Sequence, residues 1–67
     1  MSFNHRQFVL GAVKDNGLAL SYASTELKND RDVVLTAVKN NSKALVFASA
    51  QLKNDPEFMR AVDQTRT

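Results

Sequence analysis

The chain has 67 residues and no cysteine, and its nine lysines and arginines against seven aspartates and glutamates leave a formal charge of +2. A chain of this length forms one small domain that buries only about 60% of the surface exposed when it is unfolded, so it can hardly enclose a catalytic pocket. The lack of cysteine excludes disulfides and thiolate metal sites, and the small positive charge does not by itself indicate a nucleic-acid binder.

The first predicted helix spans residues 5–15. Its apolar residues recur at the spacing that gives a helix one apolar side, namely Phe8, Val9, Ala12 and Val13. Asn4 and Gln7 have the spacing of a capping box, and Phe3 and Phe8 have the spacing of a hydrophobic staple. The helix is therefore expected to begin near His5.

The second predicted helix covers residues 18–28 and has a shorter apolar stripe, made of Leu20, Ala23 and Leu27. Gly17, just before it, suits a left-handed cap at the end of the first helix. Ser24 can cap a separate short turn, so this helix is expected to be broken. In the second copy of the pattern, Asn41 and Ser49 are expected to have these two roles.

The third and fourth predicted helices, residues 31–40 and 43–53, repeat the first two with a period of 25. Sliding residues 9–30 onto residues 34–55 gives identical amino acids at 14 of 22 positions, including the tetrad Leu-Lys-Asn-Asp. Self-similarity at a fixed period indicates a repeat architecture. Each unit is predicted to be an αα-hairpin.

A fifth predicted helix, residues 56–64, opens a third unit that stops early. Asp55 is its expected N-cap, because a carboxylate there accepts hydrogen bonds from first-turn amides. Pro56 suits the first helical position, and Glu57 suits the positive end of the helix dipole. Asp30 is the corresponding N-cap of the helix at residues 31–40.

The predicted fold class is all-α, with tandem αα-hairpin repeats of 25 residues forming a compact bundle of about five short helices. Residues 1–67 form a single domain, with repeats at about 5–29 and 30–54 and a partial repeat at about 55–67. The predicted core is Phe8, Val9, Val13, Leu20, Leu27, Val34, Val38, Leu45, Leu52 and Phe58. Because Leu45 lies in the middle of the stack, Leu45→Ala is predicted to unfold most of the protein.

The stretch FVLGAVKDNGLALSYASTELKNDRDV and its later copy VVLTAVKNNSKALVFASAQLKNDPEF resemble the bacterial tandem helical repeat family known as domain of unknown function 4116. The resemblance covers roughly Phe8 to Val62. It depends on the Ala-Val-Lys, Asn-Gly, Ala-Leu and Leu-Lys-Asn-Asp positions taken together, and Ser42 departs from the Asn-Gly position. The resemblance implies a helical repeat fold, often in longer arrays, and no catalytic residues.

No group of residues in the sequence indicates catalysis or metal binding. His5 is the only histidine, and no carboxylate spacing completes a metal site around it. Ser24 and Ser49 have no positioned base. The acidic residues at the starts of helices fit capping and dipole roles, namely Asp30, Asp32, Asp55 and Glu57. We expect no enzymatic activity and no cofactor.

Two sets of residues are candidates for binding. Large side chains recur at 25-residue spacing on the edges of the apolar stripes, namely Leu10, Leu35, Tyr22 and Phe47. Leu10 and Leu35 either fill a second layer of core or form an exposed ridge that binds a protein. The repeated cations are Lys14, Lys39, Lys28 and Lys53. They are either solvated helix ends or a weak ladder of phosphate contacts.

The expected function is that of a small non-catalytic protein-interaction module with an unknown protein partner. The alternative is a weak nucleic-acid-binding protein, because consecutive short helices can mimic a helix-turn-helix, although acidic residues are interspersed among the cations. A third reading is a remnant of a longer array with no separate role. We expect a cytoplasmic protein without a membrane segment, monomeric or weakly homo-oligomeric.

Overall fold

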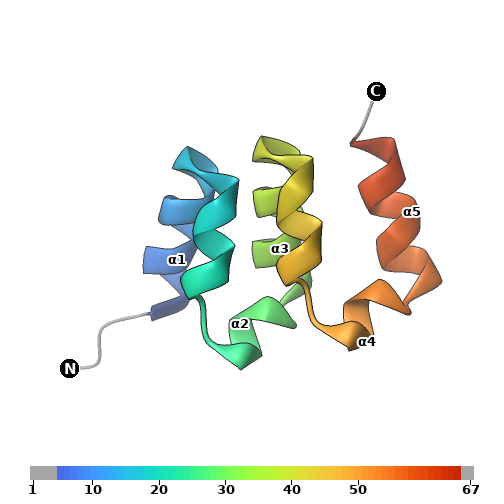
Figure 1. Cartoon of the computed structure of the whole chain (residues 1–67), viewed down its shortest axis with the longest axis horizontal. Helices are drawn as coiled ribbons and strands as arrows, with labels where there is room; N and C mark the ends of the chain where they lie inside the picture. Colours follow the sequence, from blue (N-terminus) through green and yellow to red (C-terminus); the bar gives the residue numbers. More distant parts are fainter. Residues whose placement is uncertain (1–4, 66–67) are drawn as a thin grey trace.

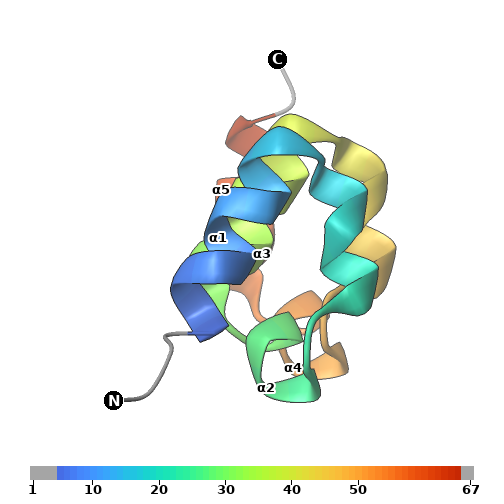
Figure 2. The same ribbon diagram turned by 90° about the vertical axis from the view of Figure 1, so that its left-hand side faces the viewer.

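The computed structural model describes residues 5–65, and within this range it contains helices and no strand. Three α-helices form one row: α1 (His5–Asp15), α3 (Arg31–Asn40) and α5 (Pro56–Gln64). Two 3₁₀ helices, η1 (Gly17–Tyr22) and η2 (Ser42–Phe47), form a second row beside it (Figures 1 and 2). The single turns α2 (Thr25–Lys28) and α4 (Ala50–Lys53) lie along one edge of the molecule, at the same ends of the helices in both rows. The all-α prediction is confirmed.

The second helix of each unit is broken at Ser24 and Ser49, as predicted from the sequence. Ser24 Oγ accepts a hydrogen bond from Leu27 N at 3.3 Å, and Ser49 Oγ accepts one from Leu52 N at 3.2 Å. The residue before each serine is extended, so the chain leaves the 3₁₀ helix, bends and starts a new turn. The second half of each unit is therefore a 3₁₀ helix followed by one α-turn.

Helices α3 and α5 begin at the positions predicted from Asp30 and Asp55. Asp30 Oδ1 accepts hydrogen bonds from Asp32 N at 3.0 Å and Val33 N at 3.3 Å. Asp55 Oδ1 accepts the equivalent pair of bonds at the start of α5. These bonds satisfy amide groups that have no partner within the helix. The proposed capping box and staple at the start of α1 depend on Asn4 and Phe3, which lie outside the described residues.

The prediction of left-handed caps was wrong, because none of the described residues has a positive φ. Asn41 is extended, with φ of −150°, and its side chain caps η2 by accepting a hydrogen bond from Lys43 N. Asn16 caps η1 in the same way. Gly17 is needed for close approach instead, since a Cβ on it would collide with the carbonyl oxygen of Ala37 in the next unit.

The core runs between the two rows and is apolar throughout. Eight of the ten predicted residues are buried, namely Val9, Val13, Leu20, Leu27, Val34, Val38, Leu52 and Phe58. Leu45 is only partly buried, and Phe8 is 60% exposed, so its placement in the core was wrong. The counterparts of Phe8 in the next two units, Val33 and Phe58, are fully buried. This position of the α-helix is therefore the one that faces the preceding unit. Since α1 begins the row, Phe8 does not share their burial.

Candidate interaction surface

The four predicted protein-contact residues lie in different environments. Leu10, Leu35 and Phe47 are partly buried and pack against the core. Tyr22 is 89% exposed, at the end of η1. Of this set, only Tyr22 offers most of its side chain to a partner.

Exposed apolar side chains gather on the row of 3₁₀ helices. Leu18 is 37% exposed, Tyr22 89% and Val46 66%, and only Phe8 on α1 joins them among the large exposed hydrophobic residues of the described chain. Sequence reasoning missed Leu18 and Val46 because it searched for residues that recur in both units. The equivalent positions of the other unit hold Lys43 and Ser21. An apolar residue at a position where the other unit has a polar one was therefore the available signal.

The four lysines of the phosphate-ladder alternative do not form one line. Lys14 and Lys39 lie in the last turns of α1 and α3, whereas Lys28 and Lys53 lie in α2 and α4. The final turns of α1 and α3 are at the opposite end of the molecule from α2 and α4 (Figure 1). The ammonium group of Lys53 also donates a hydrogen bond to the carbonyl oxygen of Val46 at 3.2 Å. The lysines thus form two separated pairs.

The acidic residues at the helix starts pair with arginines of the preceding unit. Arg6 Nε donates to Asp30 Oδ2 at 2.6 Å, and the same guanidinium lies 3.2 Å from Asp32 Oδ2. Twenty-five residues later, Arg31 Nη2 donates to Asp55 Oδ2 at 2.8 Å. The hydrogen bond from Arg6 is the main cause that lowers the pKa of Asp30. These contacts give the acids a structural role, and the 25-residue spacing of the arginines was a signal that the sequence analysis did not use.

A second contact joins unit one to unit two, and the described residues show no equivalent between units two and three. Asn40 Oδ1 accepts a hydrogen bond from Gly17 N at 2.7 Å, and its Nδ2 donates to Lys14 O at 2.9 Å. Asn40 thus holds the end of α1 and the start of η1 against α3. Its counterpart is Thr65, whose hydroxyl donates to Val62 O within its own unit. The α5 side is consequently fastened less closely to η2 than α3 is to η1.

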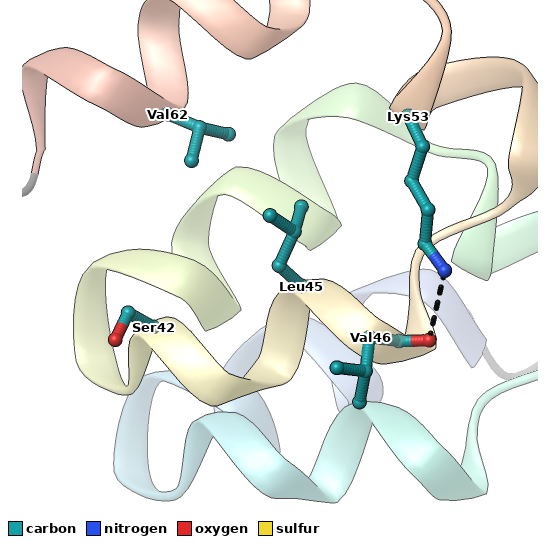
Figure 3. A pocket seen from close by; sticks show the side chains of 5 residues that line it. All are labelled: Ser42, Leu45, Val46, Lys53 and Val62. Atoms are coloured by element: carbon teal, nitrogen blue, oxygen red, sulfur yellow. Dashed lines mark hydrogen bonds between the residues drawn. The ribbon is translucent and has the colours of Figure 1, made fainter.

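An open groove of about 370 Å³ lies at this looser junction, between η2 and α5. Ser42, Leu45 and Val46 of η2 line one side, Val62 of α5 lines another, and Lys53 of α4 closes one end (Figure 3). The lining is mainly aliphatic, with one hydroxyl and one ammonium group. Such a groove suits apolar side chains of a partner, not a charged small molecule.

The described residues carry no grouping of three or more histidine, cysteine, aspartate or glutamate side chains arranged to hold a metal ion. In residues 5–65 there is also no helix with the length and hydropathy needed to cross a membrane. The exposed apolar residues on η1 and η2 and the groove beside η2 are the candidate binding features of the described residues.

Comparison with curated proteins and with solved structures gives no match. Comparison with protein families gives a match over residues 5–53, which includes both complete units except for the last residue of the second. This match covers well over half of the chain. The chain therefore belongs to the family described as Domain of unknown function (DUF4116).

Proposed function

We propose that the chain is a small non-catalytic protein-interaction module of the cytoplasm that binds a protein partner through its row of 3₁₀ helices. The observation that carries this proposal is the exposure of Leu18, Tyr22 and Val46 on η1 and η2, while the α-helical row supplies most of the core. Exposed aromatic and aliphatic side chains are typical of interfaces, where tyrosine contributes strongly to affinity.

The distribution of charge supports a protein partner over a nucleic acid. Lys14 and Lys39 lie at one end of the molecule and Lys28 and Lys53 at the other. Arg6 and Arg31 are paired with carboxylates. Binding to phosphates gains affinity from several cations along one path, and the paired arginines would have to exchange their carboxylates for phosphates.

The test is affinity capture from the source cell with the intact chain as bait, followed by quantitative mass spectrometry. The double variant Leu18→Ser, Tyr22→Ala removes apolar side chains from η1, and the matched control is Lys39→Ala, which changes an exposed residue of α3. We expect the double variant to lose a specific protein that wild type and the control retain. Equal capture by all three baits, or capture abolished by nuclease treatment, would contradict the proposal.

A further inference from the structure

Comparing the two units residue by residue shows which side of a 3₁₀ helix docks on its neighbour. η1 and η2 pack side by side. Three positions are more buried in η2 and its following turn than in η1, namely Ala44 against Ala19, Phe47 against Tyr22, and Ser49 against Ser24. These positions are therefore the side with which a unit docks on the unit before it.

The opposite side receives the following unit. Four positions are more exposed in the second unit than in the first, namely Ser42 against Gly17, Leu45 against Leu20, Val46 against Ser21, and Lys53 against Lys28. All four second-unit residues line the groove. The groove is therefore the surface that, in the first unit, η2 and α3 cover.

Backbone and side-chain polar groups belong to this docking contact as well. Ser49 N donates to the carbonyl oxygen of Lys28 at 2.9 Å, and Ser49 Oγ donates to Asn29 Oδ1 at 2.5 Å. The counterparts of these acceptors are the carbonyl oxygen of Lys53 and the side-chain amide oxygen of Asn54. The second unit thus presents the same pair of acceptors next to its groove.

The position of α5 limits which kind of protein segment can occupy the groove. In a folded second copy of the protein, η1 packs against its own α1. If that η1 docked on η2 in the register of the repeat, its α1 would have to lie where α5 already lies. The occupant is then a 3₁₀ segment that brings no first helix with it.

We propose that the groove between η2 and α5 binds a short segment of a partner protein with the pattern Ala-Leu-x-aromatic-Ala-Ser, which both η1 and η2 carry as ALSYAS and ALVFAS. The segment docks on η2 as η2 docks on η1, with its alanine and aromatic residue against Leu45 and Val46. Its serine donates to Lys53 O and Asn54 Oδ1. This inference rests on the proposed interaction function and names the chemistry of the partner.

The probe is a synthetic peptide with the sequence of residues 41–51, NSKALVFASAQ, titrated into the intact isotope-labelled chain. We expect saturable changes in amide chemical shifts that centre on the groove, at Ser42, Leu45, Val46, Lys53, Asn54 and Val62. Val46→Asp in the labelled chain should weaken binding about tenfold, since it places a charge against the apolar face of the peptide. Val46 is 66% exposed, so this variant keeps its fold, which a retained spectrum verifies.

Lys43→Ala is the matched control, because Lys43 is an exposed residue of the same helix as Val46 and does not line the groove, so it should leave peptide binding unchanged. Peptides with alanine in place of the phenylalanine, or in place of the second serine, should bind more weakly. No saturable shifts at about 1 mM peptide, or equal binding by the Val46→Asp chain, would overturn the proposal.

Concentration-dependent dimers that Val46→Asp abolishes would overturn the proposal in favour of a second copy as the occupant. Failure of the groove proposal can be distinguished from failure of the proposed function. Capture of a cellular partner that depends on Leu18 and Tyr22, without peptide binding, would refute the groove alone. Peptide binding without such capture would refute the role of the η1 residues alone.

Discussion

Arg6 donates a hydrogen bond to Asp30 across 2.6 Å, which connects the first turn of α1 to the residue that caps α3. Asp30 Oδ1 accepts from two amides of its own helix, and both carboxylate oxygens accept from Arg6 of the preceding unit. Arg31 and Asp55 repeat the contact between α3 and α5. Pro56 occupies the equivalent of Arg6 in the third unit, so α5 cannot continue this series of ion pairs. One side of the α-helical row is held by the same contact at each step.

Removing the Arg6 guanidinium is predicted to raise the pKa of Asp30 back towards its ordinary value. In the native protein Arg6 holds that pKa below the ordinary 3.8. The stabilisation is therefore complete above the unfolded pKa and is lost as the pH falls through the lower folded pKa. Arg6→Gln should show the higher pKa of Asp30 in an NMR titration of its carboxyl carbon, and Arg31→Gln should leave it unchanged. An unaltered Asp30 titration in Arg6→Gln would show that the ion pair does not form in solution.

The two glycines are predicted to respond in opposite directions to alanine. A Cβ at Gly17 would collide with the backbone of Ala37, which cannot move aside as a flexible side chain would, so Gly17→Ala should cost about 1 to 3 kcal/mol. A Cβ at Gly11, in the exposed middle of α1, meets nothing within 4 Å. Gly11→Ala should stabilise the protein by about 0.4 to 1 kcal/mol, because alanine restricts the unfolded chain. Urea unfolding of both variants measures the difference, and equal effects would refute the close approach at Gly17.

Local signals predicted the helices well and the junctions between units poorly. The aspartates and serines act on amides within their own turn, so sequence spacing was sufficient to place Asp30, Asp55 and Ser24. The role of Gly17 depends on how near α3 comes, and that distance has no local signature.

Phe8 and the groove beside η2 were missed for the same reason. Helical periodicity assigns Phe8 to the apolar side of α1, but only the place of α1 at the start of the row determines its exposure. The groove likewise depends on how α5 sits against η2, with Thr65 where the second unit has Asn40.

Leu20→Ala is predicted to destabilise the protein more than Leu45→Ala, although the two leucines have the same place in their units. Leu20 is fully buried, so its truncation should cost about 2 to 5 kcal/mol, a large part of the stability of so small a domain. Leu45 is partly buried beside the groove, so its truncation removes fewer contacts. This smaller expected loss replaces the sequence-based expectation that Leu45→Ala unfolds most of the protein. Thermal melting compares them directly. A larger loss for Leu45→Ala would mean that α5 packs on η2 more closely than described.

Asn40→Ala is predicted to loosen the junction between the first two units. The substitution removes the acceptor for Gly17 N and the donor to Lys14 O, and leaving a partly buried amide unpaired costs about 1 to 3 kcal/mol. Thr65→Ala is the matched control, since it removes one hydrogen bond within its own unit and should cost less. Hydrogen exchange should show faster exchange of the Gly17 amide in Asn40→Ala alone. Unchanged protection there would contradict the bridging role of Asn40.

The last prediction concerns nucleic acid, the runner-up from the sequence. Because the four lysines form two pairs at opposite ends of the molecule, few phosphates of one strand can be neutralised together, and few counterions are released. We expect no binding to duplex or single-stranded DNA tighter than about 100 μM at physiological salt, the weak end of non-specific binding. Fluorescence anisotropy with labelled DNA over a range of salt concentrations measures this. A micromolar complex that weakens sharply with salt, and that both Lys14→Ala and Lys39→Ala weaken, would favour nucleic acid over a protein partner.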